Sequence, residues 1–327
     1  MQPSGLVREG IAGRDAPGFG FNLSVPSNGY SWWYIDALSD DELHALTVIA
    51  FIGSVFSPYY AWARRHGPTD PIEHCALNVA LYAHTGKRWT MTERGRKHVH
   101  SSANTLLIGP SALAWHADAL RIHIDEMTVP LPARLRGEVR VQPLAILNRS
   151  FDLGPEGTHR WHPIAPRARV EVAFERPALR WKGTGYLDSN SGDVPLEETF
   201  IRWDWSRAEL RGGDTAVLYD VSRRNSGDLS LALRFDKTAS VEPFEPPPRV
   251  ALPDTGWHIV RGTRAENTSP ASVKRTLEDT PFYARSIVTA PLLGERVTAV
   301  HESLNLDRFR SAWVQMLLPF RMPRRAF

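Results

Sequence analysis

The amino-acid sequence predicts an all-β, mainly antiparallel fold made of two successive blocks of strands. Short segments with alternating or β-branched residues recur at hairpin spacing, which is typical of barrels and sandwiches. The pattern stops over residues 148–169 and then starts again. Turn-forming residues concentrate in that interval: Gly154, Pro155, Gly157, Pro163 and Pro166. Only residues 272–278 and 307–316 look helical, so we expect two barrel-like domains with few short helices.

The first block is expected to follow an irregular N-terminal segment that is rich in Gly, Pro and Asn. Its predicted strands cover residues 30–37, 46–56, 74–82, 88–93, 104–108, 112–117, 119–126 and 137–147. The segment 45–63 is uncharged, but its apolar part ends at Phe56 and Ser57-Pro58 signals a turn. A membrane-spanning helix needs about 20 predominantly apolar residues. We therefore interpret this segment as a buried strand.

The second block repeats the pattern. Its predicted strands cover residues 170–174, 178–186, 197–207, 214–222, 229–235 and 256–263. Residues 242–253 contain five prolines and are expected to form a surface connection of polyproline character. The two blocks predict an irregular lead-in over residues 1–28, a first barrel domain over 29–160 and a second barrel domain over 161–327.

The composition excludes several classes of function. The formal net charge is +3, and no run of Lys and Arg alternates with aromatic residues, so no nucleic-acid partner is expected. Cys75 is the only cysteine, which excludes an internal disulfide and a thiolate metal site and is typical of a reducing compartment. Residues 1–5 do not begin a basic segment followed by an apolar core, so we expect a cytoplasmic protein without a secretory signal.

Signals for a metal or an organic cofactor are weak. His98-Val99-His100 puts two imidazoles on one face of a strand, which is the geometry of a partial metal site. His116 and His123 lie on neighbouring predicted strands, but no spacing fixes a third ligand. No Gly-rich phosphate loop joins a strand to a helix, and no G-x-S-x-G nucleophile motif occurs. We therefore expect neither a metal nor a cofactor.

Four side chains between residues 159 and 188 suit acid chemistry on an alkene. His159 and Trp161 are two residues apart, as are Tyr186 and Asp188, so on strands each pair shares one face. A carboxylic acid beside aromatic rings can protonate a carbon–carbon double bond and shelter the resulting cation. The structural alternative is that Trp161 and Tyr186 fill a core while His159 and Asp188 belong to turns.

Tryptophan is abundant, with eleven residues. Trp203-Asp204-Trp205 places two indoles on one face of a predicted strand. These indoles either line a long apolar pocket, as aromatic residues do in ligand sites, or seal a barrel. We take Trp203 and Trp205 as candidate substrate-binding residues.

Several long segments resemble the carotenoid 1,2-hydratases, or hydroxyneurosporene synthases, of purple bacteria. They are YSWWYIDALSDD (30–41), IAFIGSVFSPYY (49–60), RWTMTERG (88–95), GTGYLDSNSG (183–192) and FIRWDW (200–205). The likeness runs from about residue 28 to the C-terminus. The resemblance implies two lipocalin-like β-barrels and a cofactor-independent hydro-lyase that adds water to the terminal C1–C2 double bond of acyclic carotenoids such as neurosporene and lycopene. It also implies functional roles for His159, Trp161, Tyr186 and Asp188.

In such a reaction Asp188 is the general acid, and protonation leaves a tertiary carbocation. An unperturbed Asp has a pKa near 3.9, so burial must keep it protonated at neutral pH. Trp161 and Tyr186 would stabilise the cation through their π faces, by about 2 kcal/mol each when desolvated. His159 in its neutral form would take the proton from the attacking water, or it would protonate or orient Asp188.

Two other functions stay open at this point. A lipocalin-like binding protein for a polyene or other apolar ligand would share the aromatic lining without an acid. An isomerase or cyclase would use the same acid and quench the cation differently. Carotenoids lie in bilayers, so we expect peripheral contact with the inner, photosynthetic membrane. Arg321, Arg324 and Arg325 form a basic cluster that either touches anionic lipid or is a solvated tail.

Overall fold

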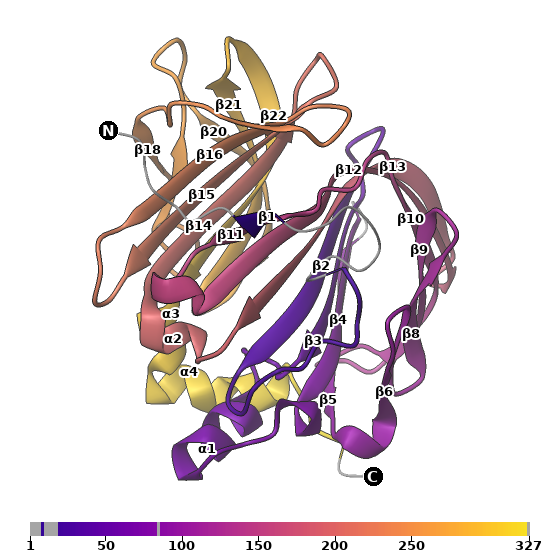
Figure 1. Cartoon of the computed structure of the whole chain (residues 1–327). Coiled ribbons are helices and arrows are strands. Elements are labelled where there is room, and N and C mark those ends of the chain that lie inside the picture. The colour runs from indigo at the N-terminus through magenta and orange to yellow at the C-terminus, as the bar shows by residue number, and fades with distance from the viewer. Residues whose placement is uncertain (1–7, 10–18, 84–85, 326–327) are drawn as a thin grey trace. The chain divides into compact units, whose positions relative to one another are not determined.

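Antiparallel strands make up most of the chain, and the few helices are short (Figure 1). The structure is a computed structural model that describes residues 8–9, 19–83 and 86–325. Contacts divide the chain into two compact units, residues 1–195 with 316–327 and residues 196–315. Each unit is built on one large antiparallel sheet. The prediction of an all-β chain with few short helices is confirmed.

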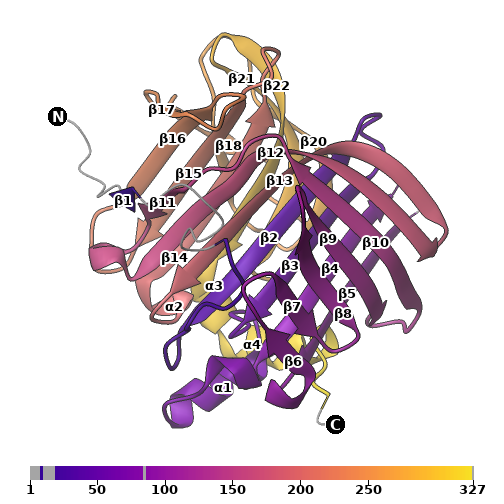
Figure 2. The ribbon, with the colours of Figure 1, turned by 45° about the vertical axis from the view of Figure 1, so that its right-hand side comes forward.

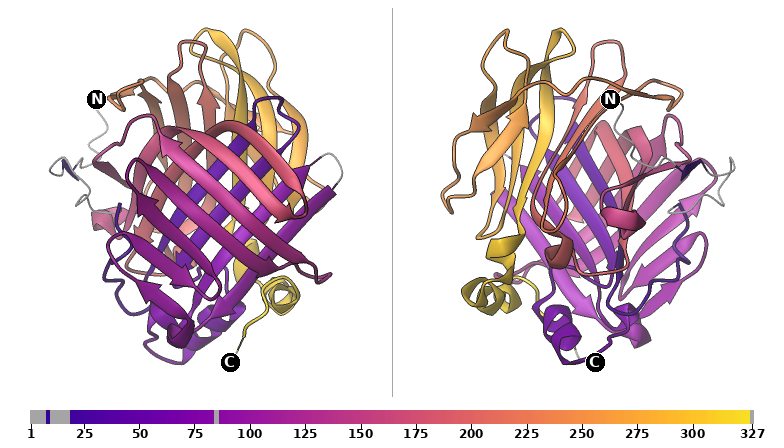
Figure 3. Two further views of the ribbon diagram at one scale, coloured as in Figure 1. Left: turned by 90° about the vertical axis from the view of Figure 1, so that its right-hand side faces the viewer. Right: turned by 60° about the vertical axis from the view of Figure 1, so that its left-hand side comes forward.

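The first unit contains a sheet of thirteen strands. Most of them pair in the order β5 (Gly86–Arg94), β4 (Cys75–Ala83), β3 (Ala45–Ile52), β2 (Tyr30–Ser39), β13 (Leu179–Gly192), β12 (His159–Arg176), β10 (Arg134–Pro143), β9 (Ala119–Met127), β8 (Ser111–His116), β7 (Thr105–Ile108) and β6 (Val99–Ser101). In addition, β1 (Arg8–Glu9) pairs with β11 (Arg149–Asp152), which also pairs with β12. In the left view of Figure 3 the near and far walls of this sheet slant in opposite directions, as in a barrel.

Contacts between β5 and the end of β9 nearly close this barrel (Figure 2). The backbone N–H of Val129, just after β9, donates to the carbonyl oxygen of Trp89 on β5 over 3.0 Å. Arg94 at the end of β5 pairs with Glu126 on β9, with 2.6 Å between Nη2 and Oε2, and both side chains are buried. Ser111 on β8 donates to the other oxygen of Glu126 at 3.0 Å. Closure of this kind protects the edge strands from pairing with other chains.

Alternation along the strands separates a hydrophobic face from a second face. On β2, Trp33 and Ile35 belong to the hydrophobic core of the first unit. Other core residues are Val48, Ala50, Leu77, Val79, Val139, Val170 and Leu187. Tyr34 and Asp36 are the intervening residues of β2, so they project from the opposite face. That opposite face bears the candidate site.

The turn-rich interval 148–169 lies inside the first unit. It contains β11, a 3-10 turn and the first part of β12. The pairing of β12 with β13 shifts register twice between residues 162 and 168, around Pro163 and Pro166. Proline has no N–H for the ladder, and bulges accommodate it without ending the strand. Contacts divide the units at residues 195/196 and again at 315/316, whereas the sequence predicted a single boundary between residues 160 and 161.

Part of the expected lead-in packs in the core. Of residues 1–28, the structure describes 8–9, which form β1, and 19–28, which have no regular structure. Phe19 stacks on Trp115 with 4.4 Å between ring centroids, and the rings of Phe21 and Trp33 meet edge-on at 5.0 Å. The remaining residues of this expected segment lie outside the described ranges.

The second unit contains a sheet of seven strands and a separate hairpin. The sheet order is β17 (Val241–Pro243), β16 (Leu229–Phe235), β15 (Thr215–Arg223), β14 (Phe200–Glu209), β22 (Glu295–Asn305), β21 (Tyr283–Leu292) and β20 (Ser272–Asp279), and the hairpin is β18 (Arg249–Leu252) with β19 (Arg261–Arg264). Residues 272–278 were expected to be helical and instead form β20, because they pair along β21. Residues 307–316 are mostly helical as expected, within α3 (Leu306–Arg310) and α4 (Ala312–Leu317).

The remaining helical segments are short. They are α1 (Pro58–His66), α2 (Leu196–Thr199) and the 3-10 turns η1 (Pro71–Glu73), η2 (Arg96–His98), η3 (Pro155–Gly157) and η4 (Leu318–Phe320). The uncharged segment 45–63 forms β3, a turn and most of α1, whose first turn is capped by the Ser57 hydroxyl. Among the residues that the structure describes, no helix combines the length and the apolar character needed to cross a bilayer.

Candidate active site

Two neighbouring strands, β12 and β13, position the four predicted site residues. Trp161 on β12 lies opposite Asn190 on β13, which is two residues from Asp188 and four from Tyr186. Residues two apart on a strand share a face, and so do residues directly opposite each other on paired strands. His159 is two residues from Trp161. All four side chains therefore project from the same face, opposite to the hydrophobic core of the first unit.

Two neutral donors hold the carboxyl group of Asp188. Trp161 Nε1 donates to Asp188 Oδ2 at 2.9 Å and lies 3.1 Å from the Tyr186 hydroxyl oxygen. The Tyr186 hydroxyl donates to the same Oδ2 at 2.8 Å. Trp161 and Tyr186 are fully buried, and Asp188 is 4% exposed. These donors fix the carboxyl group without placing a positive charge beside it.

His159 lies on the same face against Tyr30 of β2. The Tyr30 hydroxyl and His159 Nδ1 are 2.8 Å apart, and the ring centroids are 5.8 Å apart. Gly192 lies between these two residues in the register of the three strands. A Cβ atom on Gly192 would come within 2.3 Å of the Tyr30 ring and 2.7 Å of His159 Nδ1. Glycine at this position therefore lets the two rings meet across β13.

Burial keeps the imidazole of His159 neutral. Desolvation, followed by the positive charge of Arg160, lowers the pKa of His159 to about 3. The same two causes lower the pKa of His162, the next imidazole on β12, to about 4. At neutral pH both side chains are uncharged, so His159 is able to accept a proton.

Acid should destabilise the fold through these histidines. An unfolded imidazole binds a proton near pH 6.5, whereas folded His162 binds one only near pH 4. Between these values the unfolded state binds more protons, so the free energy of unfolding falls as the pH drops, by about 3 kcal/mol for His162 between pH 7 and pH 4. Urea unfolding should show that His162→Gln loses less stability than the wild type over this range. A parallel decline of the two proteins would contradict the assignment.

A second tyrosine–aspartate pair adjoins Asp188 and was not predicted. Tyr34 and Asp36 on β2 have the same Tyr-x-Asp spacing as Tyr186 and Asp188 on β13, and antiparallel pairing sets each tyrosine opposite the other aspartate. The Tyr34 hydroxyl donates to Asp36 Oδ2 at 3.2 Å, and the rings of Tyr34 and Tyr186 meet edge-on at 6.3 Å. Asp36 is fully buried. The repeated spacing was the sequence signal that could have identified this pair.

Comparison with known proteins assigns the chain to a family. Residues 48–327 match the family described as Carotenoid hydratase CrtC. The chain belongs to this family. It is 60% identical over 305 residues to the acyclic carotenoid 1,2-hydratase of Thiocapsa roseopersicina, covering 93% of this chain and 75% of that protein. It is 53% identical over 310 residues to the acyclic carotenoid 1,2-hydratase of Rubrivivax gelatinosus, covering 94% of this chain and 76% of that protein.

A solved structure shares the fold of this chain. An AttH protein from Nitrosomonas europaea superposes with a TM-score of 0.61, covering 93% of this chain and 98% of that chain. Its sequence identity is 15%, so this likeness shows the fold alone. The predicted lipocalin-like architecture agrees with this likeness.

Further aromatic rings pack against residues on the site face of the first unit. Trp32 stacks on Tyr30 with centroids 4.8 Å apart and lies 6.1 Å from the ring of Phe51. On the β12 side, Phe151 packs 5.2 Å from Trp161. Ring faces attract a cation through their quadrupole, so this surface suits a substrate that becomes positively charged.

The two tryptophans predicted to bind substrate belong to the second unit. Trp203 and Trp205 lie on one face of β14 and are 7% and 4% exposed. Trp203 packs edge-on against Phe200 at 5.3 Å and lies 5.0 Å from the ring of Tyr219. Their role in substrate binding stays a prediction.

The histidine pair considered as a partial metal site is divided between two elements. His98 ends the 3-10 turn η2, and His100 lies on β6, so the two are not on one strand as expected. Within the described ranges no group of three or more His, Cys, Asp or Glu side chains is placed to hold a metal ion. The expectation that catalysis needs no metal stays a prediction.

Proposed function

We propose that this chain adds water across the terminal C1–C2 double bond of acyclic carotenoids such as neurosporene and lycopene. The observation that carries the proposal is the buried carboxyl group of Asp188, held by the indole N–H of Trp161 and the hydroxyl of Tyr186. The relatives that are 60% and 53% identical are named for this activity.

The first step is protonation of the alkene by Asp188. Its proton goes to C2, the π electrons form the new C–H bond, and a tertiary cation remains at C1. Because Oδ2 already accepts hydrogen bonds from Trp161 and Tyr186, the acid proton belongs on Oδ1. The ring faces of Trp161 and Tyr186 stabilise the cation by about 2 kcal/mol each.

The second step is capture of the cation by water. The water oxygen bonds to C1 and gives a proton to the neutral imidazole of His159. That proton then returns to the carboxylate of Asp188, so the cycle adds one water molecule and restores the acid. The burial of His159 and Asp188 keeps other water molecules from quenching the cation.

Isotopes test this reaction. Purified protein incubated with lycopene in detergent should yield a hydroxylated product, with one non-exchangeable deuterium from D₂O at C2 and one ¹⁸O from H₂¹⁸O at C1. Chromatography with mass spectrometry measures both. Recovery of bound but unchanged pigment would instead indicate a binding protein, and a cyclised or isomerised product without ¹⁸O would indicate the isomerase or cyclase alternative.

Two substitutions of Trp161 should distinguish the contribution of its ring face to the hydration rate from that of its indole N–H. Trp161→Phe removes the hydrogen bond to Asp188 but keeps an aromatic face, whereas Trp161→Ala removes both. We expect the alanine variant to have a kcat roughly tenfold or more below that of the phenylalanine variant. Steady-state hydration assays on both proteins measure the ratio. Equal rates would mean that the ring does not stabilise the cation.

We further propose that the protein is cytoplasmic and meets the inner, photosynthetic membrane as a peripheral protein, because its substrate is a bilayer lipid. The three C-terminal arginines are not equivalent in this respect. Arg324 pairs with buried Glu93. The guanidinium of Arg321 lies 4.7 Å above the ring of Trp89. Arg325 instead lines a cationic cavity and is the arginine best placed to meet an anionic lipid.

A further inference from the structure

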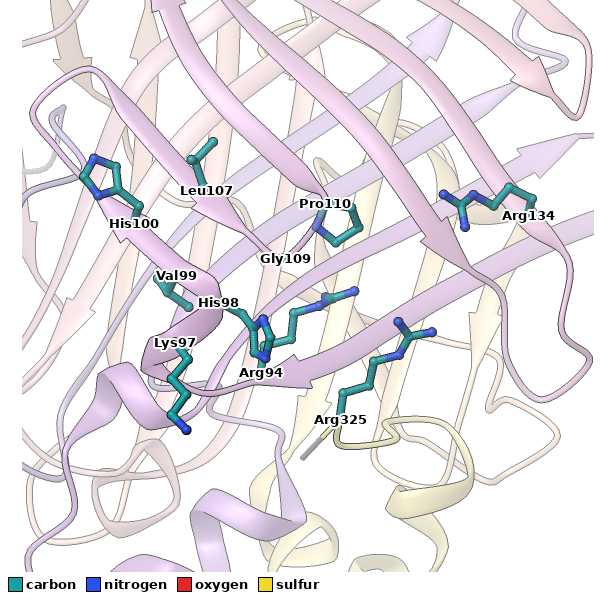
Figure 4. A pocket seen from close by; sticks show the side chains of 10 residues that line it. All are labelled: Arg94, Lys97, His98, Val99, His100, Leu107, Gly109, Pro110, Arg134 and Arg325. Atoms are coloured by element: carbon teal, nitrogen blue, oxygen red, sulfur yellow. The ribbon is translucent and has the colours of Figure 1, made fainter. Parts of the chain in front are cut away.

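The first unit contains a positively charged cavity whose lining shares no residue with the candidate active site. Its volume is about 560 Å³. It is lined by Arg94, Lys97, His98, Val99, His100, Leu107, Gly109, Pro110, Arg134 and Arg325 (Figure 4). Among the described residues, the lining contains four arginine or lysine side chains and two histidines but no Asp or Glu. Such a concentration of one charge attracts anions.

Arg94 is fixed at the buried side of this cavity. It is 4% exposed and pairs with Glu126, which also accepts a hydrogen bond from Ser111. Gly109 has φ +61°, and a Cβ atom there would come within 2.2 Å of Arg94 Nε. Glycine is therefore needed both for the turn and for the close approach to the guanidinium. The position of Arg94 is set by the fold before any ligand arrives.

The exposed side of the cavity has positive charge that other side chains do not neutralise. Arg134 pairs with Asp125. Lys97 and Arg325 are exposed, and within the described ranges neither has an ion-pair partner. These two side chains therefore give the cavity two positive charges that no ion pair neutralises, although Arg325 acts electrostatically on buried Glu126.

Arg325 is held at the cavity by backbone pairing. The N–H of Glu93 on β5 donates to the carbonyl oxygen of Pro323 at 2.9 Å, and the N–H of Arg325 donates to the carbonyl oxygen of Glu93 at 3.0 Å. Trp89 Nε1 donates to the carbonyl oxygen of Arg321 at 3.3 Å. The C-terminal segment thus lies along the edge of β5 and directs Arg325 to the cavity (Figure 4).

Exposed apolar side chains occur in the cavity lining and in the two segments that carry Arg134 and Arg325. Leu107 lines the cavity and is 38% exposed. Leu131, in the β9–β10 turn that leads to Arg134, is 81% exposed, and Phe320 in the C-terminal segment is 72% exposed. A soluble phosphate would gain nothing from these residues, whereas exposed apolar groups in the same segments as cationic ones suit the boundary between lipid headgroups and acyl chains.

We propose that this cavity binds the phosphoryl group of an anionic phospholipid headgroup and so docks the first unit on the membrane. The proposal rests on the proposed function in one respect, namely that the substrate is taken from a bilayer. Lys97 and Arg325 supply the charge that attracts the phosphoryl oxygens, and Arg94, paired with Glu126, forms the buried wall of the cavity. Leu131 and Phe320 enter the headgroup region.

Vesicle binding tests the site with a charge-matched control. The double variant Lys97→Glu with Arg325→Glu changes the cavity, whereas Arg121→Glu with Arg180→Glu makes the same change of charge at exposed residues that do not line it. Flotation with phosphatidylcholine vesicles, with and without phosphatidic acid or phosphatidylglycerol, measures binding. We expect anionic vesicles to bind the wild type and the control alike and to bind the cavity variant roughly tenfold or more weakly. An equal loss in both double variants would overturn the proposal.

Two further measurements distinguish a phospholipid site from a site for soluble phosphate. Leu131→Ser should weaken vesicle binding, and isothermal titration with inorganic phosphate should show much weaker binding than that of the anionic vesicles. Phosphate binding that depends on Lys97 and Arg325, together with vesicle binding that does not, would identify a soluble-phosphate site and overturn the lipid assignment. The cavity variant should hydrate lycopene normally in detergent, where no membrane is needed. Loss of hydration in every protein, with vesicle binding as expected, would contradict the proposed function and leave the lipid site standing.

Discussion

Asp188→Asn should abolish hydration while leaving the fold and pigment binding nearly intact. The amide has the shape of the carboxyl group and can still accept hydrogen bonds from Trp161 and Tyr186, but it has no acid proton to transfer. Loss of a general acid typically slows a reaction by a factor of roughly 10² to 10⁴, and protonation of an unactivated alkene belongs at the upper end. Chromatography of lycopene products measures the loss of rate, and the absorbance of bound pigment measures binding in the same samples.

The chain offers a matched control in Asp36. Asp36→Asn makes the same change at a fully buried carboxyl group that is also held by a tyrosine two residues away. We expect Asp36→Asn to retain far more activity than Asp188→Asn. The reverse order, with Asp188→Asn active, would transfer the acid role to Asp36. The next carboxylate along the chain after Asp188, Asp193, pairs with Arg160 and is 44% exposed, so it is poorly placed to stay protonated.

The part of the candidate site that was predictable is the part encoded locally. Spacings of two residues put His159 with Trp161 and Tyr186 with Asp188 on common faces as soon as the segments are strands. Alternation and β-branched residues identified most strands because these patterns are also local in the sequence. The contact between Trp161 and Asp188 then follows from the pairing of β12 with β13, which are neighbours in the sequence.

The unpredicted features depend on pairing between distant segments. β2 lies beside β13 although about 150 residues separate them, and only that register brings Tyr34 and Asp36 to Asp188. No local pattern specifies which distant strand will be the neighbour. The predicted domain boundary differs from the observed division of the chain for another reason. Pro163 and Pro166 usually end strands, but in β12 they coincide with register shifts, so the strand continues.

Glu126→Ala should destabilise the protein by about 3 to 5 kcal/mol, because it breaks a buried ion pair and leaves a charge without its partner. Arg94 is 4% exposed, so its buried guanidinium would lose its carboxylate partner. Ser111 would lose its acceptor in the same substitution. These groups join β5, β8 and β9 where the barrel closes, so the loss should appear in the cooperative unfolding of the first unit. The urea midpoint, followed by tryptophan fluorescence, measures it.

Three further variants test whether burial of the Arg94–Glu126 ion pair causes the loss of stability. Glu126→Gln keeps the size and one acceptor and should lose less stability than Glu126→Ala. The double variant Arg94→Met with Glu126→Leu removes both charges and should recover much of the loss, since a buried ion pair is often replaceable by apolar side chains. Glu171→Ala breaks the exposed pair with Lys182 and should change the midpoint little. If Glu126→Ala were no more destabilising than Glu171→Ala, the ion pair would not hold the barrel closed.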